Sequence, residues 1–566
     1  MKNKFHSTYI LLVVIVIAFI LRFIFLGNVP PSPNWDEVSL GYNAYSLWET
    51  GRDEYGKFLP VVLRSYDDYK PALYAYFVIP SFLLFGLNTF AVRFPSMLFG
   101  VLTVLATYFL ILEIFGKEKV TLIGRQISPK IIGVLTSLFL AISPWHIHFS
   151  RIAFESNVGL AFNVFGALFF LKGLRTHWYL LVSAFLFGIN PSMYQSDKVF
   201  TPLLVLALAI IYLKQLLKIP KKFLVSSVII GLVVLFPMVY FHFTDEQAFA
   251  RAQGVSVFSD QTEFLKENVK RLEVDRQRGD VIGLVFDNRR VEFAKAIVAG
   301  YISHFDLNWL FINGDIARHH APNMGLLYLF ELPFLLIGIY QMAFGKFSKT
   351  TKWTIFSWFL LSPVPAMITS GVPHAVRTLN FLPMFQVFIA VGIIASVVAI
   401  SNIRYQIAKI QLKYLIFSLS ILFLLFSILF YLNQYFIQLN YETSRDWLYG
   451  YKQAIEKVKT IEHSYDKIIV SNQPPLDQSY MFFLFYLAYP PDMYQEQAAN
   501  ASGGFRENHM FGKYEFRPID ISNEEKSENI LYIGRPGDFH EDVNKIEVVN
   551  YLDGTTAIEI VSGSNI

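Results

Sequence analysis

The sequence has no cysteine and few charged residues. Of its 566 residues, 0 are cysteine and 16% are Asp, Glu, Lys or Arg, whereas a soluble globular protein has about 25% charged residues. The absence of cysteine excludes disulfide bonds, thiolate zinc sites, iron–sulfur clusters and cysteine nucleophiles. The net charge of +4 is small and spread along the chain, so we expect no nucleic-acid partner. This composition is unlike that of an ordinary soluble enzyme.

Long apolar runs take up much of the chain instead. Hydrophobic residues make up 54% of the sequence, and about 20 apolar residues suffice to cross a bilayer. The first run follows Lys2 and Lys4 and lacks a small-x-small cleavage site, so we interpret it as an uncleaved span rather than a signal peptide. About eleven runs predict an α-helical polytopic membrane protein. They are 9–27, 90–115, 131–149, 157–171, 178–192, 199–217, 223–241, 324–344, 353–369, 380–400 and 413–432.

Basic residues predict which loops face the cytoplasm. If the N-terminus is cytoplasmic, the loops expected inside are rich in lysine and arginine, and Glu118 is the only acid beside these charges. The pattern predicts a multi-pass protein of the plasma membrane with an extracytoplasmic C-terminus. The basic residues are Lys2, Lys4, Lys117, Lys119, Arg125, Lys130, Lys172, Arg175, Lys214, Lys218, Lys221, Lys222, Lys346, Lys349, Lys352, Arg404, Lys409 and Lys413.

The remaining loops and the tail are predicted to face outward. If the run 71–87 also crossed the membrane, every later loop would invert, so we interpret it as an interfacial or re-entrant helix. The tail is more polar and mixes helical and strand patterns, with a hairpin expected at Asp553-Gly554. The sequence therefore predicts a transmembrane domain and a small α/β domain. The domains are 1–432 and 433–566, and the longer outer loops are 28–89 and 242–323.

The first outer loop contains two adjacent carboxylates. Asp36 and Glu37 follow the first span and precede a segment of helical spacing that ends near Gly51. At a helix N-terminus the dipole favours the ionised carboxylate, which suits a general base or a metal ligand. The alternative is that Asp36 only caps the helix.

Two basic residues lie at the outer ends of the predicted apolar helices. Lys70 precedes the run 71–87, where a compact cation could hold a lipid phosphate. The alternative is a lysine that merely extends its charged end to the membrane surface. Arg93, at the outer mouth of the second span, has the same two interpretations.

A third group lies between the third and fourth spans, where His146, His148, Arg151 and Glu155 occur together. The two histidines could bind a metal, but two histidines are weak evidence, and ordinary interfacial histidines are the favoured interpretation. Glu155 could form a carboxylate pair with Asp36. An active site facing the outer leaflet is the resulting hypothesis, because ionisable residues near a membrane are functional candidates. Others on this face are Tyr194, Lys198, Arg318, His319, His320, His374 and Arg377.

These residues, in this order, resemble the GT-C clan of polyprenyl-phosphate-dependent glycosyltransferases. The resemblance is to the bacterial protein O-mannosyltransferase and lipid A aminoarabinose transferase type, and it covers roughly residues 1–400. The motifs are short, and their joint order makes the match specific. They are Asp36-Glu37, Tyr69-Lys70-Pro71, FGLNTFAVRFPSMLFG, SRIAFES, HHAP from His319 to Pro322, and VRTLNFLP.

The resemblance implies a reaction and roles for the residues. Such enzymes take a sugar from a polyprenyl-phosphate carrier in the outer leaflet and transfer it, with inversion, to a hydroxyl of a protein, lipid or glycan. The carboxylate pair Asp36 and Glu37 would be catalytic, with Asp36 as general base, and Lys70 would hold the carrier phosphate. Glu155 stands where relatives usually have aspartate. It would steady the acceptor or share a divalent cation, the one cofactor left open, with Asp36.

The resemblance also implies roles for further residues, which match the motifs of the relatives less directly. Relatives place a His-Arg pair near the phosphate, whereas this chain has His319-His320, and Arg318 could supply the missing charge. Tyr69 stands where relatives have an acid, which leaves the identity of the donor open. The phosphate-binding candidates are Lys70, Arg93, Arg318, His319, His320 and Arg377. The acceptor-binding or metal-binding candidates are Glu155, Arg151, His146 and Tyr194.

Two other classes of function remain open. A lipid or polysaccharide transporter would carry charges deep in several spans, but the main candidates here, Arg22 and Glu113, lie near span ends. It would also show paired repeats, which these spans lack. A non-catalytic scaffold would bind a partner through its outer tail, and mutation of its outer carboxylates would affect stability alone.

Overall fold

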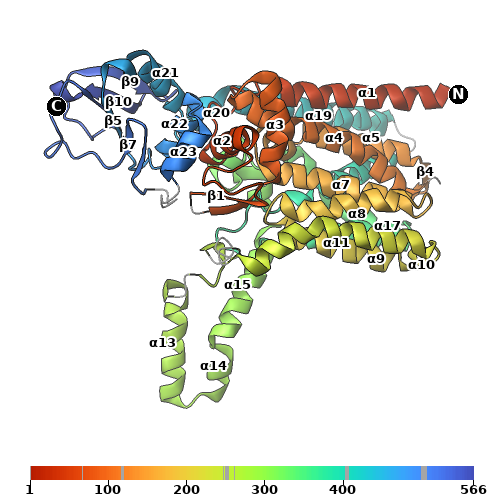
Figure 1. Ribbon diagram of the computed structural model, residues 1–566. Coiled ribbons are helices and arrows are strands. Elements are labelled where there is room, and N and C mark those ends of the chain that lie inside the picture. Colours follow the sequence, from red (N-terminus) through yellow and green to blue (C-terminus); the bar gives the residue numbers. More distant parts are fainter. Residues whose placement is uncertain are drawn as a thin grey trace.

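The computed structural model shows a helical bundle joined to a smaller α/β domain (Figure 1). It describes residues 2–66, 68–116, 120–245, 248, 254–259, 262–401, 407–498 and 506–566. The predictions for Lys117, Glu118, Lys119 and Arg404 lie outside these residues, as do the side chains of Lys2, Lys4, Lys409 and Lys413.

Every predicted apolar run overlaps a helix. By length and composition, five of the described helices can cross a membrane, or six if the bent pair α5–α6, which turns by 57°, forms one span. The total of about eleven spans stays a prediction, because several helices are short. The helices of the bundle are α1 (Lys2–Phe23), α4 (Thr89–Phe115), α5 (Pro129–Ile142), α6 (Pro144–Arg151), α7 (Glu155–Gly173), α8 (Tyr179–Ile189), α9 (Asp197–Ile211), α11 (Lys221–Thr244), α16 (Leu332–Phe344), α17 (Lys349–Leu361), α18 (Met384–Ser401) and α19 (Ile407–Asn433).

The two ends of the bundle differ in what they carry. Strand β4 (Arg125–Ile127), in a predicted inner loop, and helix α10 (Leu213–Leu216), at the inner end of the predicted run 199–217, lie at the end that holds the N-terminus (Figure 1). The α/β domain and helix α2 (Trp35–Thr50) lie at the opposite end, which is called the outer end below after its predicted orientation. This separation agrees with the predicted orientation, which itself stays a prediction.

The first outer loop folds into a helix, a two-stranded ribbon and a second helix. Strands β1 (Val62–Ser65) and β2 (Asp68–Pro71) pair antiparallel, with Leu63 opposite Lys70. Helix α3 (Leu73–Phe85) follows directly and packs against α2 and α4. Lys70, predicted to precede the helical run 71–87, lies in strand β2 of this ribbon, and the helix begins only at Leu73.

The second outer region forms a helical arm. Helices α13 (Thr262–Arg278), α14 (Val281–Phe286) and α15 (Arg289–Ser303) extend away from the bundle (Figure 1). The chain then returns through short helical turns at Trp309–Asn313 and Ala317–His319. These turns bring the segment 314–320 back against the outer end of the bundle.

The tail forms a six-stranded mixed sheet in the order β6-β7-β5-β8-β10-β9 among the residues described. Strands β9 (Lys545–Asn550) and β10 (Thr556–Ser562) form the hairpin expected at Asp553-Gly554, so this prediction is confirmed. The helical and strand patterns of the tail match α21 (Tyr451–Ile461), β5 (Lys467–Val470) and β8 (Ile530–Gly534). The sequence did not predict the elements in the middle of the tail, which are α22 (Ser479–Leu487), α23 (Pro491–Ala498), β6 (His509–Phe511) and β7 (Tyr514–Phe516).

Helix α22 joins the tail to the bundle. Its side chains share one hydrophobic cluster with α2 and α3, and Gly41 of α2 lies where a Cβ would come within 2.5 Å of the Phe485 ring. A larger residue at position 41 would push these helices apart. The α/β domain therefore packs directly on the helix that carries the candidate carboxylates.

Candidate active site

The N-terminus of α2 is capped by Asn34. Its side-chain oxygen accepts the Glu37 N–H, and the Glu37 carboxylate accepts the Asn34 N–H, which completes a capping box. The interpretation of Asp36 as the cap is therefore wrong. Asp36 lies in the first helical turn, where the positive end of the dipole favours its ionised form.

Glu37 forms a buried ion pair with Arg93. The guanidinium donates from Nε to Oε1 at 2.8 Å and from Nη2 to Oε2 at 3.0 Å, and both side chains are almost fully buried. The Ala153 N–H also donates to Oε1 at 2.9 Å. Arg93 further donates to three backbone carbonyls of the segment after α1, those of Leu26, Pro30 and Ser32. The pair thus joins α2, α4 and two loops.

Asp36 and Lys70 form a second pair that reaches solvent. The Lys70 Nζ donates to Asp36 Oδ1 at 2.5 Å, and the Asp36 side chain is 30% exposed whereas that of Lys70 is 6% exposed. The Arg318 guanidinium stacks 3.9 Å from the centroid of the Trp35 ring, next to Asp36 in sequence. Arg318 also interacts electrostatically with Asp36. Two cations therefore flank one accessible carboxylate.

Glu155 and Tyr194 complete this group. Glu155 is the first residue of α7 and is buried, and it interacts electrostatically with both Lys70 and Asp36. Tyr194 interacts in the same way with Glu155, Asp36 and Arg377. Residues from five separate segments of the chain thus meet at the outer end of the bundle.

Arg377 belongs to a neighbouring cluster of histidines. Asp315 Oδ2 accepts from His319 Nδ1 at 3.1 Å and from the Ala375 N–H at 2.7 Å. Burial alone raises the pKa of Asp315, but the His319 hydrogen bond and charge and the Ala375 N–H outweigh it and bring the pKa to about 2. The rings of His319 and His374 lie 4.9 Å apart. This cluster borders the Asp36 group through Arg318 and Arg377.

Four predicted site residues are engaged elsewhere. His146 bonds to Arg22 at 2.7 Å and is fully buried. Arg151 donates to backbone carbonyls of α1 and of the loop after it. These two residues therefore bind α6 to α1, and Arg93 pairs with Glu37 as described above. His320 bonds through Nδ1 to the Ala321 carbonyl.

His148 and Gly314 shape the segment that carries these side chains. His148 bonds through Nε2 to the Arg318 carbonyl at 2.7 Å, so it positions Arg318 and does not face Asp36. Gly314 has a φ of 66°, and a Cβ there would lie 2.4 Å from the His320 ring. Only glycine suits this turn.

Sequence reasoning missed three residues near the site. Glu54 is fully buried and bonded to Asn43, and burial raises its pKa to about 8 against the opposing effects of Asn43 and Lys70. Its segment, GRDEYGK, gives no signal beyond that of a surface turn. Asp315 and His304 were also missed; the spacing Asp-x3-His in a loop was a weak signal for the first.

Comparison with known proteins identifies the fold. The family model for dolichyl-phosphate-mannose-protein mannosyltransferases matches residues 69–241. The crystal structure of ArnT from Cupriavidus metallidurans in the apo state is similar over 99% of both chains, with 11% identity and a TM-score of 0.53. This chain resembles the GT-C glycosyltransferases. The predicted helical membrane class is confirmed at that level, whereas the site roles and the topology stay predictions.

Other comparisons add context to the GT-C resemblance. ArnT bound to undecaprenyl phosphate is similar over 97% of both chains, with 12% identity and a TM-score of 0.52. The archaeal oligosaccharyltransferase AglB from Archaeoglobus fulgidus has 13% identity and a TM-score of 0.47; the match covers 86% of this chain but only 64% of AglB, less than two thirds of its length. No curated protein matches the sequence.

Proposed function

We propose that this chain is an inverting glycosyltransferase that moves a sugar from a polyprenyl-phosphate donor to an acceptor hydroxyl outside the membrane. The observation that carries the proposal is the contact between the partly exposed Asp36 and the buried Lys70 at the outer end of the bundle. The similar fold of an ArnT structure that holds undecaprenyl phosphate supports the class of carrier. The acceptor is a protein, lipid or glycan.

Lys70 and its neighbours supply the charge that the leaving group needs. As the sugar–phosphate bond breaks, its electron pair stays on the phosphate oxygen, and fixed cations stabilise that charge. Lys70 lies beside Asp36, and Arg318 stacks over Trp35, the residue before Asp36. Arg377 interacts electrostatically with Tyr194 and is the third cation of this group, after Lys70 and Arg318.

Asp36 accepts the proton of the acceptor hydroxyl. The oxygen of that hydroxyl then attacks the anomeric carbon from the face opposite the phosphate, which inverts the configuration. In the structure the Asp36 carboxylate is paired with Lys70. A donor phosphate that takes over Lys70 would break this ion pair and allow Asp36 to act as general base, so donor binding would precede activation of the acceptor.

Glu37 and Glu155 have different proposed tasks. Glu37 is saturated by Arg93 and backbone N–H groups, so it positions Asp36 rather than reacting. Glu155 is near Asp36 and Lys70, where it would orient the acceptor or share a divalent cation with Asp36.

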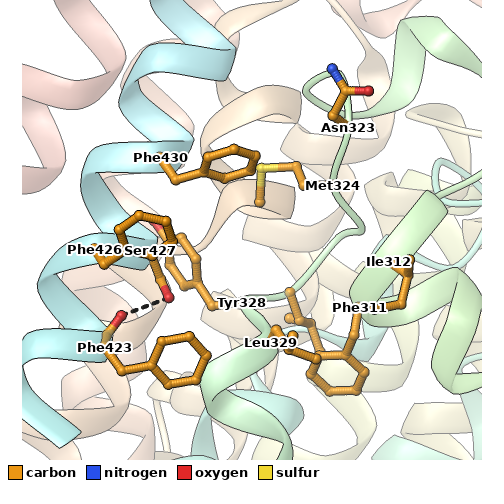
Figure 2. Close-up of a pocket in the computed structure, with 11 residues that line it drawn as sticks. Phe311, Ile312, Asn323, Met324, Tyr328, Leu329, Phe423, Phe426, Ser427 and Phe430 are labelled. Atoms are coloured by element: carbon orange, nitrogen blue, oxygen red, sulfur yellow. Dashed lines mark hydrogen bonds between the residues drawn. The ribbon is translucent and has the colours of Figure 1, made fainter. Parts of the chain in front are cut away.

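An apolar pocket offers a path for the lipid chain. It has a volume of about 220 Å³ and lies between α19 and the segment that leads from the histidine cluster. Figure 2 shows Phe423, Phe426 and Phe430 of α19 facing Met324 and Tyr328 across it. A prenyl chain bound there would place its phosphate toward residues 315–320.

The test is donor turnover by purified protein. Labelled polyprenyl-phospho-sugars with different sugars are offered in detergent with a hydroxyl acceptor, and release of polyprenyl phosphate is measured. We expect Glu155→Gln to raise the KM for the acceptor while donor affinity is unchanged. If Glu155→Gln weakens donor binding as strongly as acceptor binding, the division of roles is wrong.

A further inference from the structure

We propose that Asp315, His319 and His374 form a binding site for a zinc-class divalent cation. One ligand atom from each of the three residues lies within 4.8 Å of the other two. Asp315 and His319 come from the returning segment after the helical arm, and His374 comes from the loop before α18. This site is distinct from the Asp36–Glu155 pair considered above.

One carboxylate oxygen of Asp315 is available to a ligand. The Asp315 side chain is 8% exposed, and its Oδ2 accepts two hydrogen bonds, from His319 and from the Ala375 N–H. Its Oδ1 is buried and has no hydrogen-bond partner among the residues that the structure describes. Burying an ionised oxygen without a partner costs free energy, and a bound cation would remove that cost.

The histidines are held in a matching arrangement. His319 Nδ1 lies 3.1 Å from Asp315 Oδ2, close to the spacing of about 3.3 Å between two ligands of one tetrahedral zinc, so a metal bound by both atoms would displace the proton that they share. His374 Nδ1 faces the Arg377 N–H at 3.5 Å, which leaves Nε2 as its ligand atom. Metal-binding histidines commonly use one nitrogen for the metal and the other for a carboxylate or backbone group.

A third histidine supports the loop that carries His374. His304 lies at the end of α15 and bonds through Nδ1 to the Gly300 carbonyl at 2.7 Å. Its Nε2 accepts the His374 backbone N–H at 3.2 Å. His304 is therefore fully engaged and acts as a positioning residue rather than a ligand.

The chemistry of the three side chains favours zinc. Two imidazoles and one carboxylate are typical zinc ligands, and three protein ligands leave a fourth position for water or another group. The chain has no cysteine, so histidine and carboxylate are the ligand types at hand for such a metal.

The bound cation would join the two segments that carry Arg318 and Arg377. Arg318 immediately precedes His319, and Arg377 follows His374 by three residues. A metal would thereby fix the spacing of two proposed phosphate-binding cations. This consequence rests on the proposed function, whereas the metal site itself does not.

The test measures metal in the purified full-length protein, independently of turnover. Elemental analysis after zinc loading and gel filtration should give close to one zinc per chain, and cobalt loading should give the visible absorption of a tetrahedral site. Asp315→Asn, His319→Gln and His374→Gln should each lower zinc affinity by about 10-fold or more. The matched control is His463→Gln, an exposed histidine of the tail, which should bind as wild type.

Two outcomes overturn the proposal. Wild-type protein that holds no zinc or cobalt at micromolar free metal does so, even if the variants fail to fold. Equal zinc content in wild type and in folded Asp315→Asn does so as well. Donor turnover by a protein without this metal would leave the proposed function standing and the metal proposal refuted, so the two failures are distinguishable.

Discussion

The buried pair of Glu37 and Arg93 is predicted to be a principal source of stability at the outer end of the bundle. Glu37→Gln keeps the shape of the side chain but removes the charge that faces the guanidinium. Because both side chains are almost fully buried, the change leaves Arg93 uncompensated, which costs about 3–5 kcal/mol in the free energy of unfolding.

The double variant Glu37→Leu, Arg93→Met tests whether the pair stabilises the fold through its hydrogen bonds to backbone groups as well as through the attraction between its own charges. Two apolar residues often replace a buried ion pair at little cost. Here the replacement would leave the N–H groups of Asn34 and Ala153 unbonded, together with backbone carbonyls now served by Arg93. Each such group costs about 1–3 kcal/mol, so the double variant should be destabilised as well.

Unfolding by SDS titration in mixed micelles measures these effects. The control is Glu456→Gln, the same chemical change in an exposed pair with Lys452 at 3.8 Å, for which about 0.5 kcal/mol or less is expected. A loss below 1 kcal/mol for Glu37→Gln, or full recovery in the double variant, would refute the reasoning.

Three further predictions concern charge and orientation. Lys70→Met should lower donor turnover by about 10²–10³-fold, with Lys452→Met as control, and turnover at the wild-type rate would contradict its role. Glu54 has a pKa of about 8 in the folded protein against an ordinary value of 4.5, so the folded state binds the extra proton between these values. Stability should therefore fall as pH rises from about 5 to about 8 and level off above the folded-state pKa, and Glu54→Gln should flatten this profile; an unchanged profile would show that Glu54 does not cause it. A reporter fused after residue 566 should be active only outside the membrane, and cytoplasmic activity would overturn the orientation.

The helices were predictable because a long apolar run that enters a membrane can satisfy its backbone hydrogen bonds in few structures other than a helix. Each run overlaps a helix, and the hairpin at Asp553-Gly554 followed from its turn residues. The ribbon that carries Lys70 was not predictable, because two four-residue strands depend on each other and on α2 rather than on local pattern. The number of spans depends on the bilayer as well as on the chain.

The grouping of the candidate site residues was predictable where the order of motifs carried the information. Asp36, Lys70, Glu155 and Tyr194 were chosen from the sequence, and the structure brings them together. The partner of Glu37 could not be read from the sequence, because Arg93 lies 56 residues away. Burial also decided which residues are engaged elsewhere: His146 and Arg151 bind α6 to α1, and nothing local distinguishes them from residues that face the site.

The central claim is that Asp36 takes the proton of the acceptor while Lys70 holds the donor phosphate. The most direct measurement is release of labelled polyprenyl phosphate from a polyprenyl-phospho-sugar by wild type, by Asp36→Asn, and by the exposed control Asp492→Asn. We predict that Asp36→Asn still binds polyprenyl phosphate but releases it about 10²–10⁴-fold more slowly, and that the control matches wild type. Release by Asp36→Asn at the wild-type rate would contradict the account.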